Sequence, residues 1–411
     1  MFKKNAVYLM IILLLFNLFS LSTSASKDTV FSDDDLYGYD EEVVEAMVAS
    51  KSFDSFESKA YILIDAATGQ VLCEKNSNER LPIASVTKVM SMLLIMEAID
   101  SGKIKLDDIV TASEYAAGMG GSQVYLEPGE QYSVRDALKA VAMHSANDVT
   151  VSLAELISGS EEAFVVEMNE KAKELGMKNT HFLDCTGLTD EGHYSCAYDV
   201  AIMSRELVTK HPKILEYTSI WMDSFRGGEF ELTNTNKLVR FYNGADGLKT
   251  GFTRAAGHCL SATATRNNMR LISVVLGGSD SNSRFAQSRK LLDHGFANYE
   301  SKKVNEKGGE VREVVIKKGI ESMAMAVYAD DLNLLLSKGN KDKIKREIRV
   351  LKSIAAPVKK GQRIGEVIYK VDGNEIGRID LVCDREVEKV SFIKMFKRLF
   401  TSWYNIGRNV D

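Results

Sequence analysis

Cysteine is scarce in this sequence, and the five that occur among 411 residues are widely separated. No two of them form a C-x-x-C pair and none clusters with histidine, so the sequence offers no metal site and we expect no bound metal. Scattered thiols in an odd number are typical of small buried residues. At most one disulfide is expected, drawn from Cys185, Cys196 and Cys259.

An excess of positive charge is also absent. The chain has 52 lysine and arginine residues against 57 aspartate and glutamate residues, a formal net charge of −5 at pH 7. Proteins that bind nucleic acid present a basic surface, so we expect no nucleic-acid partner. The hydrophobic share of 45% and the charged share of 27% are those of an ordinary globular protein, and the length allows two domains.

The apolar run near the N-terminus, residues 8–21, is short. Lys3 and Lys4 precede it, and small residues follow at 22–25. This order is typical of a secretory signal peptide, so we expect residues 1–25 to be removed and the protein to be exported. The alternative is an uncleaved membrane anchor, but a bilayer span needs about 20 residues. Cleavage changes the formal charge from −5 to −7, because both lysines are lost.

The remaining chain divides into segments of different pattern. Residues 26–56 are an acidic leader. Residues 57–299 have strand patterns at both ends of a block of helix patterns, which predicts an α/β or α+β domain with a sheet covered by helices. Residues 300–388 contain short alternating runs separated by turn signals, which predict a small all-β domain. Within the first domain we expect hairpins at 59–75 and 260–275, a strand at 247–252, and helices at 89–100, 134–143, 149–157 and 285–299.

Residues 389–411 form an amphipathic pattern. Apolar and aromatic side chains, Trp403 and Tyr404 among them, share one helical face, and Lys394, Lys397 and Arg398 frame it. Basic residues with interfacial aromatics favour a helix that lies in a membrane surface. The alternative is a terminal helix packed on its own protein.

Three short motifs carry the chemistry. The first is Ser85-Val-Thr-Lys88, in which a helix start would place serine and lysine on one face. A lysine amine can take a serine proton only when it is neutral, which requires burial or a neighbouring cation, and Lys249 is a candidate for that cation. The same S-x-x-K pattern also occurs at 24–27 and 391–394. An isolated copy therefore favours an ordinary surface helix.

The second motif is Ser145-Ala-Asn147. The Ser145 hydroxyl can relay a proton to a leaving amine, and the Asn147 amide can hold a substrate amide oxygen. Both residue types also favour helix N-caps, so a cap before Val149 is an alternative or an additional role. We assign no role to His144, which precedes the motif.

The third motif, Lys249-Thr250-Gly251, lies in a strand-like run. A glycine there would leave room for a substrate backbone against the strand edge, and Lys249 and Thr250 would face a bound carboxylate. In this order the three motifs resemble those of the penicillin-recognising serine acyltransferases, which include penicillin-binding proteins and β-lactamases.

The chain resembles the D-alanyl-D-alanine carboxypeptidases, the low-molecular-mass penicillin-binding proteins, from Tyr61 to the C-terminal segment. Supporting stretches include 119–123, 179–182, 192–195, 247–253, 270–275 and 290–296. Segments 221–223 and 234–238 resemble the branch found in endospore-forming bacteria. The resemblance implies a β-lactamase/transpeptidase-like fold, with an antiparallel sheet covered by helices, followed by an all-β domain.

The resemblance also implies roles for individual residues. Ser85 would be the acylated nucleophile, Lys88 its general base and Ser145 a proton relay. Asn147, Lys249, Thr250 and Gly251 would bind substrate, and the main-chain N–H groups of Ser85 and Phe252 would form the oxyanion hole. Arg284 occupies the place of the family's carboxylate-binding arginine, and a solvent-exposed arginine at a helix start is the alternative.

The implied reaction is removal of the terminal D-alanine from peptidoglycan pentapeptide stems, at the outer face of the cytoplasmic membrane, without a metal or organic cofactor. β-Lactams would acylate the same serine. The alternatives are a β-lactamase, a catalytically silent penicillin-binding sensor, or transpeptidation by the same acyl-enzyme. Relatives often carry histidine or asparagine before Gly187, where this chain has Cys185 and Thr186, so its substrate preference and deacylation rate are open.

Overall fold

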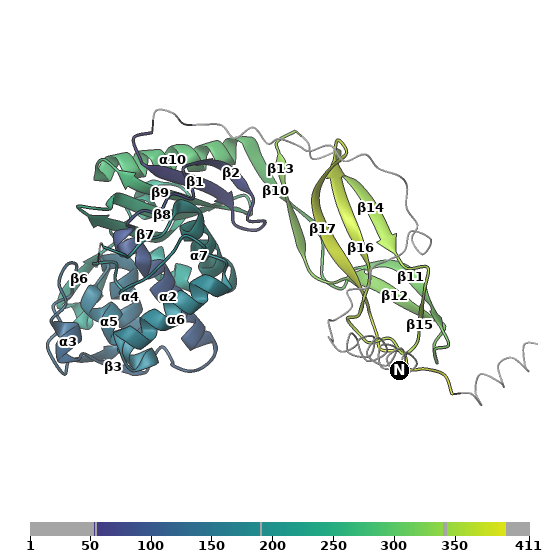
Figure 1. The fold of residues 1–411 in the computed structure, drawn as a ribbon, viewed down its shortest axis with the longest axis horizontal. Helices are drawn as coiled ribbons and strands as arrows, with labels where there is room; N and C mark the ends of the chain where they lie inside the picture. Colours follow the sequence, from purple (N-terminus) through teal and green to yellow (C-terminus); the bar gives the residue numbers. More distant parts are fainter. Residues whose placement is uncertain (1–52, 54–55, 190, 340–342, 392–411) are drawn as a thin grey trace, which may run out of the picture.

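The computed structural model describes residues 53, 56–189, 191–339 and 343–391, which form a large domain and a smaller β domain (Figure 1). The predicted signal peptide, nearly all of the acidic leader and residues 392–411 of the predicted amphipathic helix lie outside the described residues.

The large domain is built on a five-stranded antiparallel sheet with the strand order β2-β1-β9-β8-β7. Side chains alternate between its two faces. Ile62 and Ile64 pack with the helical block, whereas Tyr61 and Leu63 pack with α10 on the other face. The strands are β1 (Ala60–Asp65), β2 (Val71–Lys75), β7 (Ala245–Thr253), β8 (Gly257–Arg266) and β9 (Met269–Gly278), and the covering helix is α10 (Ser281–Asn298).

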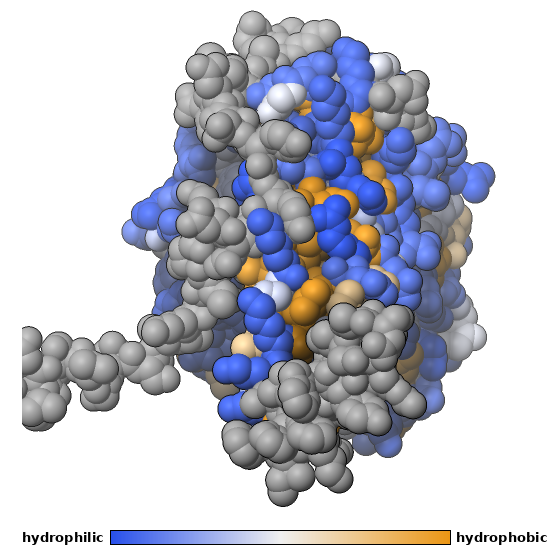
Figure 2. Space-filling model, turned by 90° about the vertical axis from the view of Figure 1, so that its right-hand side faces the viewer, coloured by the Kyte–Doolittle hydropathy of each residue, from blue (hydrophilic) through white to orange (hydrophobic). Residues whose placement is uncertain are grey.

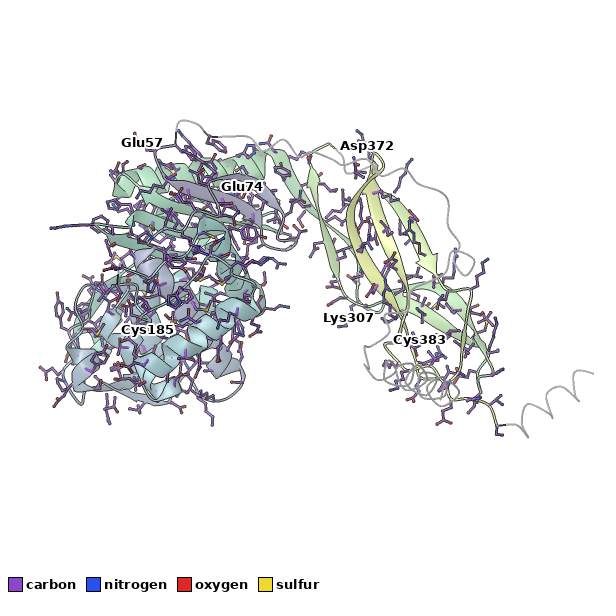
Figure 3. All side chains as sticks on the ribbon, viewed as in Figure 1. Glu57, Glu74, Cys185, Lys307, Asp372 and Cys383 are labelled. Carbon is purple, nitrogen blue, oxygen red and sulfur yellow. The ribbon has the colours of Figure 1, made fainter. Side chains whose placement is uncertain are left out.

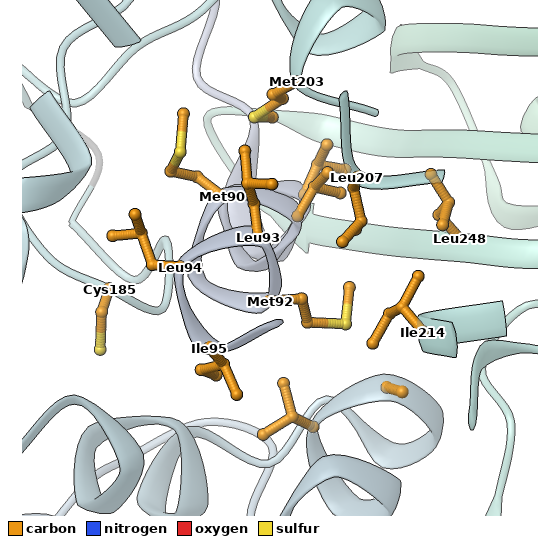
Figure 4. Close-up of a cluster of buried hydrophobic side chains, with 14 of the residues drawn as sticks. Met90, Met92, Leu93, Leu94, Ile95, Cys185, Met203, Leu207, Ile214 and Leu248 are labelled. Atoms are coloured by element: carbon orange, nitrogen blue, oxygen red, sulfur yellow. The ribbon is translucent and has the colours of Figure 1, made fainter. Parts of the chain in front are cut away.

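Helix α2 (Lys88–Asp100) runs through the middle of the helical block, and its apolar side chains point in every direction around it (Figure 4). Because it is apolar all round, it is buried all round. The block also contains α3 (Glu114–Ala117), α4 (Val134–Lys139), α5 (Asn147–Ser158), α6 (Glu161–Glu174), α7 (Ala197–Lys210) and α8 (Leu215–Thr218). The short helix α9 (Leu238–Phe241) instead packs Leu238 with the residues on the α10 face of the sheet. Two small hairpins, β3 (Ile109–Thr111) with β4 (Gln131–Ser133) and β5 (Met222–Phe225) with β6 (Phe230–Thr233), complete the block.

The second domain has the order β14-β16-β17-β12-β11-β15 in a six-stranded sheet, and β10 pairs with β13 separately. Seen from its outer end, apolar side chains form a strip between rows of hydrophilic ones (Figure 2). The strands are β10 (Tyr299–Asn305), β11 (Glu310–Lys317), β12 (Met323–Tyr328), β13 (Leu332–Ser337), β14 (Lys345–Val350), β15 (Ser353–Ala355), β16 (Arg363–Val371) and β17 (Asn374–Cys383).

The predicted fold class is confirmed: an antiparallel sheet covered by helices is followed by an all-β domain. Lys389, the first residue of the predicted C-terminal helix, instead pairs with Gly319, and the Val390 N–H donates to Lys318. Those two residues are therefore tied to the β domain. Within the described part of the chain, no helix is both long and apolar enough to span a bilayer.

The cysteines are buried free thiols, as their scattered positions indicated. Cys185 lies inside the large domain and Cys383 in the β domain (Figure 3). No disulfide joins Cys185, Cys196 and Cys259.

Candidate active site

Ser85 and Lys88 lie where a short 3-10 turn, η2 (Ala84–Thr87), leads into α2. The predicted proximity is present, because the Lys88 Nζ donates to the Ser85 Oγ at 3.1 Å. The same Nζ donates to the main-chain oxygen of Thr186 at 2.8 Å and to the side-chain oxygen of Asn147. An ammonium has three donors, so all three are used. Ser85 is half-buried and Lys88 is fully buried.

Burial lowers the pKa of Lys88 from 10.5 to about 8, although Cys185, Asp184 and other acidic groups oppose the shift. Burial also lowers the pKa of Lys249, and the nearby Lys88 charge lowers it further. Of the two causes that the sequence suggested for Lys88, burial is therefore the dominant one. Desolvation favours the neutral amine, which is the form that can accept a proton.

Ser145 follows a π-helical turn, η3 (Ala140–His144), and has the left-handed φ of 67°. Its Oγ is buried and has no hydrogen-bond partner among the described residues. The N-cap alternative is wrong, because α5 begins at Asn147 with Ala146 at the cap position and no side-chain cap bond. Burying a hydroxyl without a hydrogen-bond partner is unfavourable in free energy. The Ser145 hydroxyl is therefore free to form a hydrogen bond with a bound group.

The Asn147 amide links two parts of the site. Its oxygen accepts from Lys88 and its Nδ2 donates to the main-chain oxygen of Gly120 at 2.7 Å. Its main-chain N–H donates to Ser122 at 2.7 Å. Asn147 therefore fixes the loop around residues 120–122 to the lysine.

Lys249, Thr250 and Gly251 lie on β7, which is an edge strand as expected. The Lys249 Nζ donates to its neighbour's main-chain oxygen at 2.9 Å, and the Thr250 hydroxyl donates to Thr235 at 2.7 Å. Gly251 also has a steric role that the sequence did not indicate, and the room it leaves for a substrate backbone stays a prediction. A Cβ there would lie 2.7 Å from the Ile83 oxygen and 3.0 Å from the Ser85 nitrogen, so the glycine makes room for the nucleophile's own turn.

Arg284 on α10 is buried rather than exposed at a helix start, and burial lowers its pKa to about 10. Its Nη1 donates to the main-chain oxygens of Gly251 at 2.9 Å and Cys259 at 3.1 Å. The guanidinium therefore braces the end of the third motif. Phe252, the next residue, is 57% exposed and stacks on His258 with ring centroids 4.4 Å apart.

The loop that carries Cys185 and Thr186 was expected to border the site, but none of its residues was given a catalytic or binding role. The Asp184 carboxylate accepts from the N–H groups of Thr186 and Gly187, which turns the Thr186 oxygen toward Lys88. Burial raises the pKa of Asp184, but His193 and the bonds to Thr189 outweigh it and leave the pKa at about 2. An aspartate three residues before a glycine is a turn signal that the sequence did offer.

The same loop is locked to the nucleophile's turn. His193 is buried, and its Nε2 lies 2.8 Å from the Thr87 Oγ1. Gly187 has a φ of 80°, and a Cβ there would lie 2.0 Å from the Ala84 oxygen. The Lys88 Nζ contacts the main-chain oxygen of Thr186, which any residue type would supply. The difference from the family pattern at Cys185 and Thr186 therefore does not remove this contact.

The structure thus brings the residues of all three motifs around Ser85. A buried lysine with a lowered pKa beside a serine hydroxyl, followed in the second motif by a buried hydroxyl without a partner, suits acyl transfer through a covalent intermediate. Among the residues that the structure describes, no three histidine, cysteine or carboxylate side chains come close enough to hold a metal ion.

Comparison with known proteins agrees with this geometry. Residues 46–280 match the D-alanyl-D-alanine carboxypeptidase family, and residues 299–389 match the C-terminal domain of penicillin-binding protein 5. The D-alanyl-D-alanine carboxypeptidase DacF of Bacillus subtilis is 47% identical over 351 residues, which are 84% of this chain and 90% of that protein.

Solved structures give the same result. Penicillin-binding protein 5 from Haemophilus influenzae is 35% identical with a TM-score of 0.75, over 82% of this chain and 98% of that one. Penicillin-binding protein D2 from Listeria monocytogenes, in its ampicillin-bound form, is 34% identical with a TM-score of 0.54, over 59% and 98% of the two chains. Sequence, fold and site geometry agree, and the chain belongs to the D-alanyl-D-alanine carboxypeptidase family.

Proposed function

We propose that this carboxypeptidase removes the terminal D-alanine from peptidoglycan stem pentapeptides through an acyl-enzyme formed on Ser85. The observation that carries the proposal is the 3.1 Å contact between the Lys88 Nζ and the Ser85 Oγ, made by a fully buried lysine. A neutral amine at this distance takes the serine proton as the oxygen attacks the carbonyl carbon of the penultimate D-alanine.

Binding precedes this step. The stem extends along the free edge of β7, and its terminal carboxylate is held by Lys249, Thr250 and Arg284. The Asn147 amide, fixed by Lys88 and Gly120, holds a substrate amide. The main-chain N–H groups of Ser85 and Phe252 stabilise the oxyanion of the tetrahedral intermediate.

Ser145 then passes a proton to the leaving amine. Its buried, unbonded Oγ supports this role, because the hydroxyl gives up no protein partner to do so. The C–N bond breaks, D-alanine departs, and water hydrolyses the ester on Ser85. A β-lactam acylates the same serine, but its leaving group stays attached to the acyl chain, so the adduct persists.

The test is D-alanine release from a peptide ending in D-Ala-D-Ala, measured with wild type and Ser85→Ala. Ser391→Ala serves as the matched control, because Ser391 begins another S-x-x-K pattern. Release that is lost only in Ser85→Ala supports the proposal. Unchanged release by Ser85→Ala overturns the nucleophile assignment. Rapid turnover of penicillin instead would favour a β-lactamase, and stable labelling without release would favour a sensor or a transpeptidase.

We also propose that the exported enzyme is held at the outer face of the cytoplasmic membrane by residues 389–411. The pattern of aromatic and basic residues in that segment supports this placement. Because Lys389 and Val390 contact the β domain, the informative deletion removes residues 392–411. The shortened protein should move to the soluble fraction, and continued sedimentation with membranes would contradict the anchor.

A further inference from the structure

Some of the backbone strain in this structure lies at and near the site. Nine described residues other than glycine have a positive φ. Four are asparagine or aspartate, which tolerate this conformation. Of the other five, Lys318 lies in the β domain, Ala84 and Ser145 belong to the site, and Tyr125 and Arg226, with φ of 59° and 55°, contact each other. A bulky residue keeps such a φ only when its surroundings enforce it, and such positions gather at functional sites.

Arg226 enforces the conformation of Tyr125 from one side. Its Nη1 donates to the Val124 oxygen at 2.8 Å and its Nη2 to the Tyr125 oxygen at 3.0 Å. The guanidinium is itself held by Glu130, with Nε to Oε1 at 2.6 Å and Nη2 to Oε2 at 2.8 Å. A two-point ion pair of this kind fixes the orientation of the arginine.

Asp148 enforces it from the other side. Its carboxylate accepts from the N–H groups of Val124 at 3.1 Å and Leu126 at 3.2 Å. Asp148 is buried and directly follows Asn147, whose amide holds Gly120 at the start of the same loop. The loop that carries Tyr125 is therefore attached to the second motif at several points.

These bonds hold the backbone of Tyr125, and the residue itself is 69% exposed. Its burial therefore does not explain why the backbone strain is maintained. The Tyr125 ring is tilted against the Phe230 ring, with centroids 6.4 Å apart. The Phe230 and His144 rings are perpendicular, with centroids 5.4 Å apart. His144 directly precedes Ser145. Tyr125, Phe230 and His144 thus form an aromatic wall that continues from the second motif to the surface.

We propose that Tyr125 binds the acyl part of the substrate, by packing its ring on the aliphatic side chain of the residue before D-Ala-D-Ala. This inference rests on the proposed function. The leaving D-alanine has only a methyl side chain and is held by its carboxylate at β7. The acyl part is the longer portion and extends beyond the motifs, and an exposed rigid ring offers it apolar area at little entropic cost.

Two acetylated peptides test the inference, one with Nε-acetyl-lysine and one with glycine before D-Ala-D-Ala. Tyr125→Ala should raise KM about tenfold for the lysyl peptide, with kcat nearly unchanged, and leave the glycyl peptide unaffected. Tyr125→Phe should retain wild-type values. Arg226→Gln should reproduce the KM effect although the ring is intact, because the ring is no longer held in place. Tyr198→Ala, an exposed tyrosine on α7, is the control.

An equal effect of Tyr125→Ala on both peptides, or no effect on either, overturns the inference. A second comparison measures the rates of acylation by benzylpenicillin and by 6-aminopenicillanic acid, which lacks the acyl side chain. It tests the same contact and does not depend on D-alanine release. A wild-type protein that releases no D-alanine overturns the proposed function, and the ratio of the two penicillin rates then decides the role of Tyr125. Loss of the preference for benzylpenicillin in Tyr125→Ala supports it, and an unchanged preference overturns it.

Discussion

The Nζ of Lys88 donates to the main-chain oxygen of Thr186 at 2.8 Å, across 98 positions of the sequence. The lysine of the first motif is therefore held by a loop that belongs to none of the three motifs. Asp184 shapes that loop and His193 joins it to the nucleophile's turn. Substitutions can separate the roles of the motif residues from the role of this supporting loop.

Acylation should depend on the protonation of Lys88. Because burial lowers the pKa of Lys88 to about 8, the neutral amine increases as the pH rises toward that value. The second-order rate of acylation by a penicillin should rise about tenfold per pH unit below pH 7 and level off above the pKa. Circular dichroism at each pH controls for unfolding. A rate that is constant from pH 6 to 9 would contradict the assignment of Lys88 as the base.

Gly251→Ala should disturb the nucleophile. The new Cβ would lie 2.7 Å from the Ile83 oxygen and 3.0 Å from the Ser85 nitrogen, and both are backbone atoms. We expect penicillin acylation to fall about 100-fold, since small displacements of reacting groups have effects of that order. Gly120→Ala is the control, because no atom lies within 4 Å of its added Cβ. Wild-type acylation by Gly251→Ala would show that the turn can adjust.

Ser145→Ala should separate activity from stability. Its Oγ has no partner in the described structure, so the free energy of unfolding should change by less than about 0.5 kcal/mol. D-Alanine release should fall between about 100-fold and 10,000-fold if the hydroxyl relays a proton.

Ser91→Ala provides the matched comparison for Ser145→Ala. The buried Ser91 Oγ donates to the main-chain oxygen of Cys185 at 2.6 Å. Removal of this hydroxyl should lower the free energy of unfolding, measured in urea, by about 1–2 kcal/mol. Equal losses of stability in the two variants would mean that Ser145 is a structural residue.

His193→Ala should weaken the support of the nucleophile's turn. The His193 Nε2 lies 2.8 Å from the Thr87 Oγ1, and the Leu183 N–H donates to Nδ1 on the other side of the ring. Loss of the buried ring should cost about 2–3 kcal/mol of unfolding free energy and slow acylation. His193→Gln supplies a donor near the same place and should restore acylation more than stability. Full acylation by His193→Ala would contradict this role.

Much of the fold was predictable because its signals are local. The hairpin over β1 and β2, the turn between β8 and β9, and helix α2 follow from side-chain periodicity and turn residues within short windows. The order of the three motifs identified the chemistry and the family. Their side chains are the reactive groups themselves, so the residue types were sufficient for that inference.

The N-cap alternative for Ser145 and Asn147 is wrong, and the steric role of Gly251 beside Ser85 was not predicted. In both cases a local preference was weighed without the tertiary partner: Lys88 and Gly120 for the Asn147 amide, and the Ser85 turn for Gly251. Conformational preference is a weak determinant where a long-range contact satisfies the same group.

Fold class, family and reactive groups could be inferred from the residues alone, since these depend on side-chain type and near-neighbour spacing. How those groups are held depends on packing between distant segments: the Thr186 oxygen on Lys88, the ion pair of Arg226 and Glu130 behind Tyr125, and the brace of Arg284 on β7. Several of these contacts end on main-chain oxygens, which every residue carries. No residue type marks such a contact, so it emerges only when distant segments pack together.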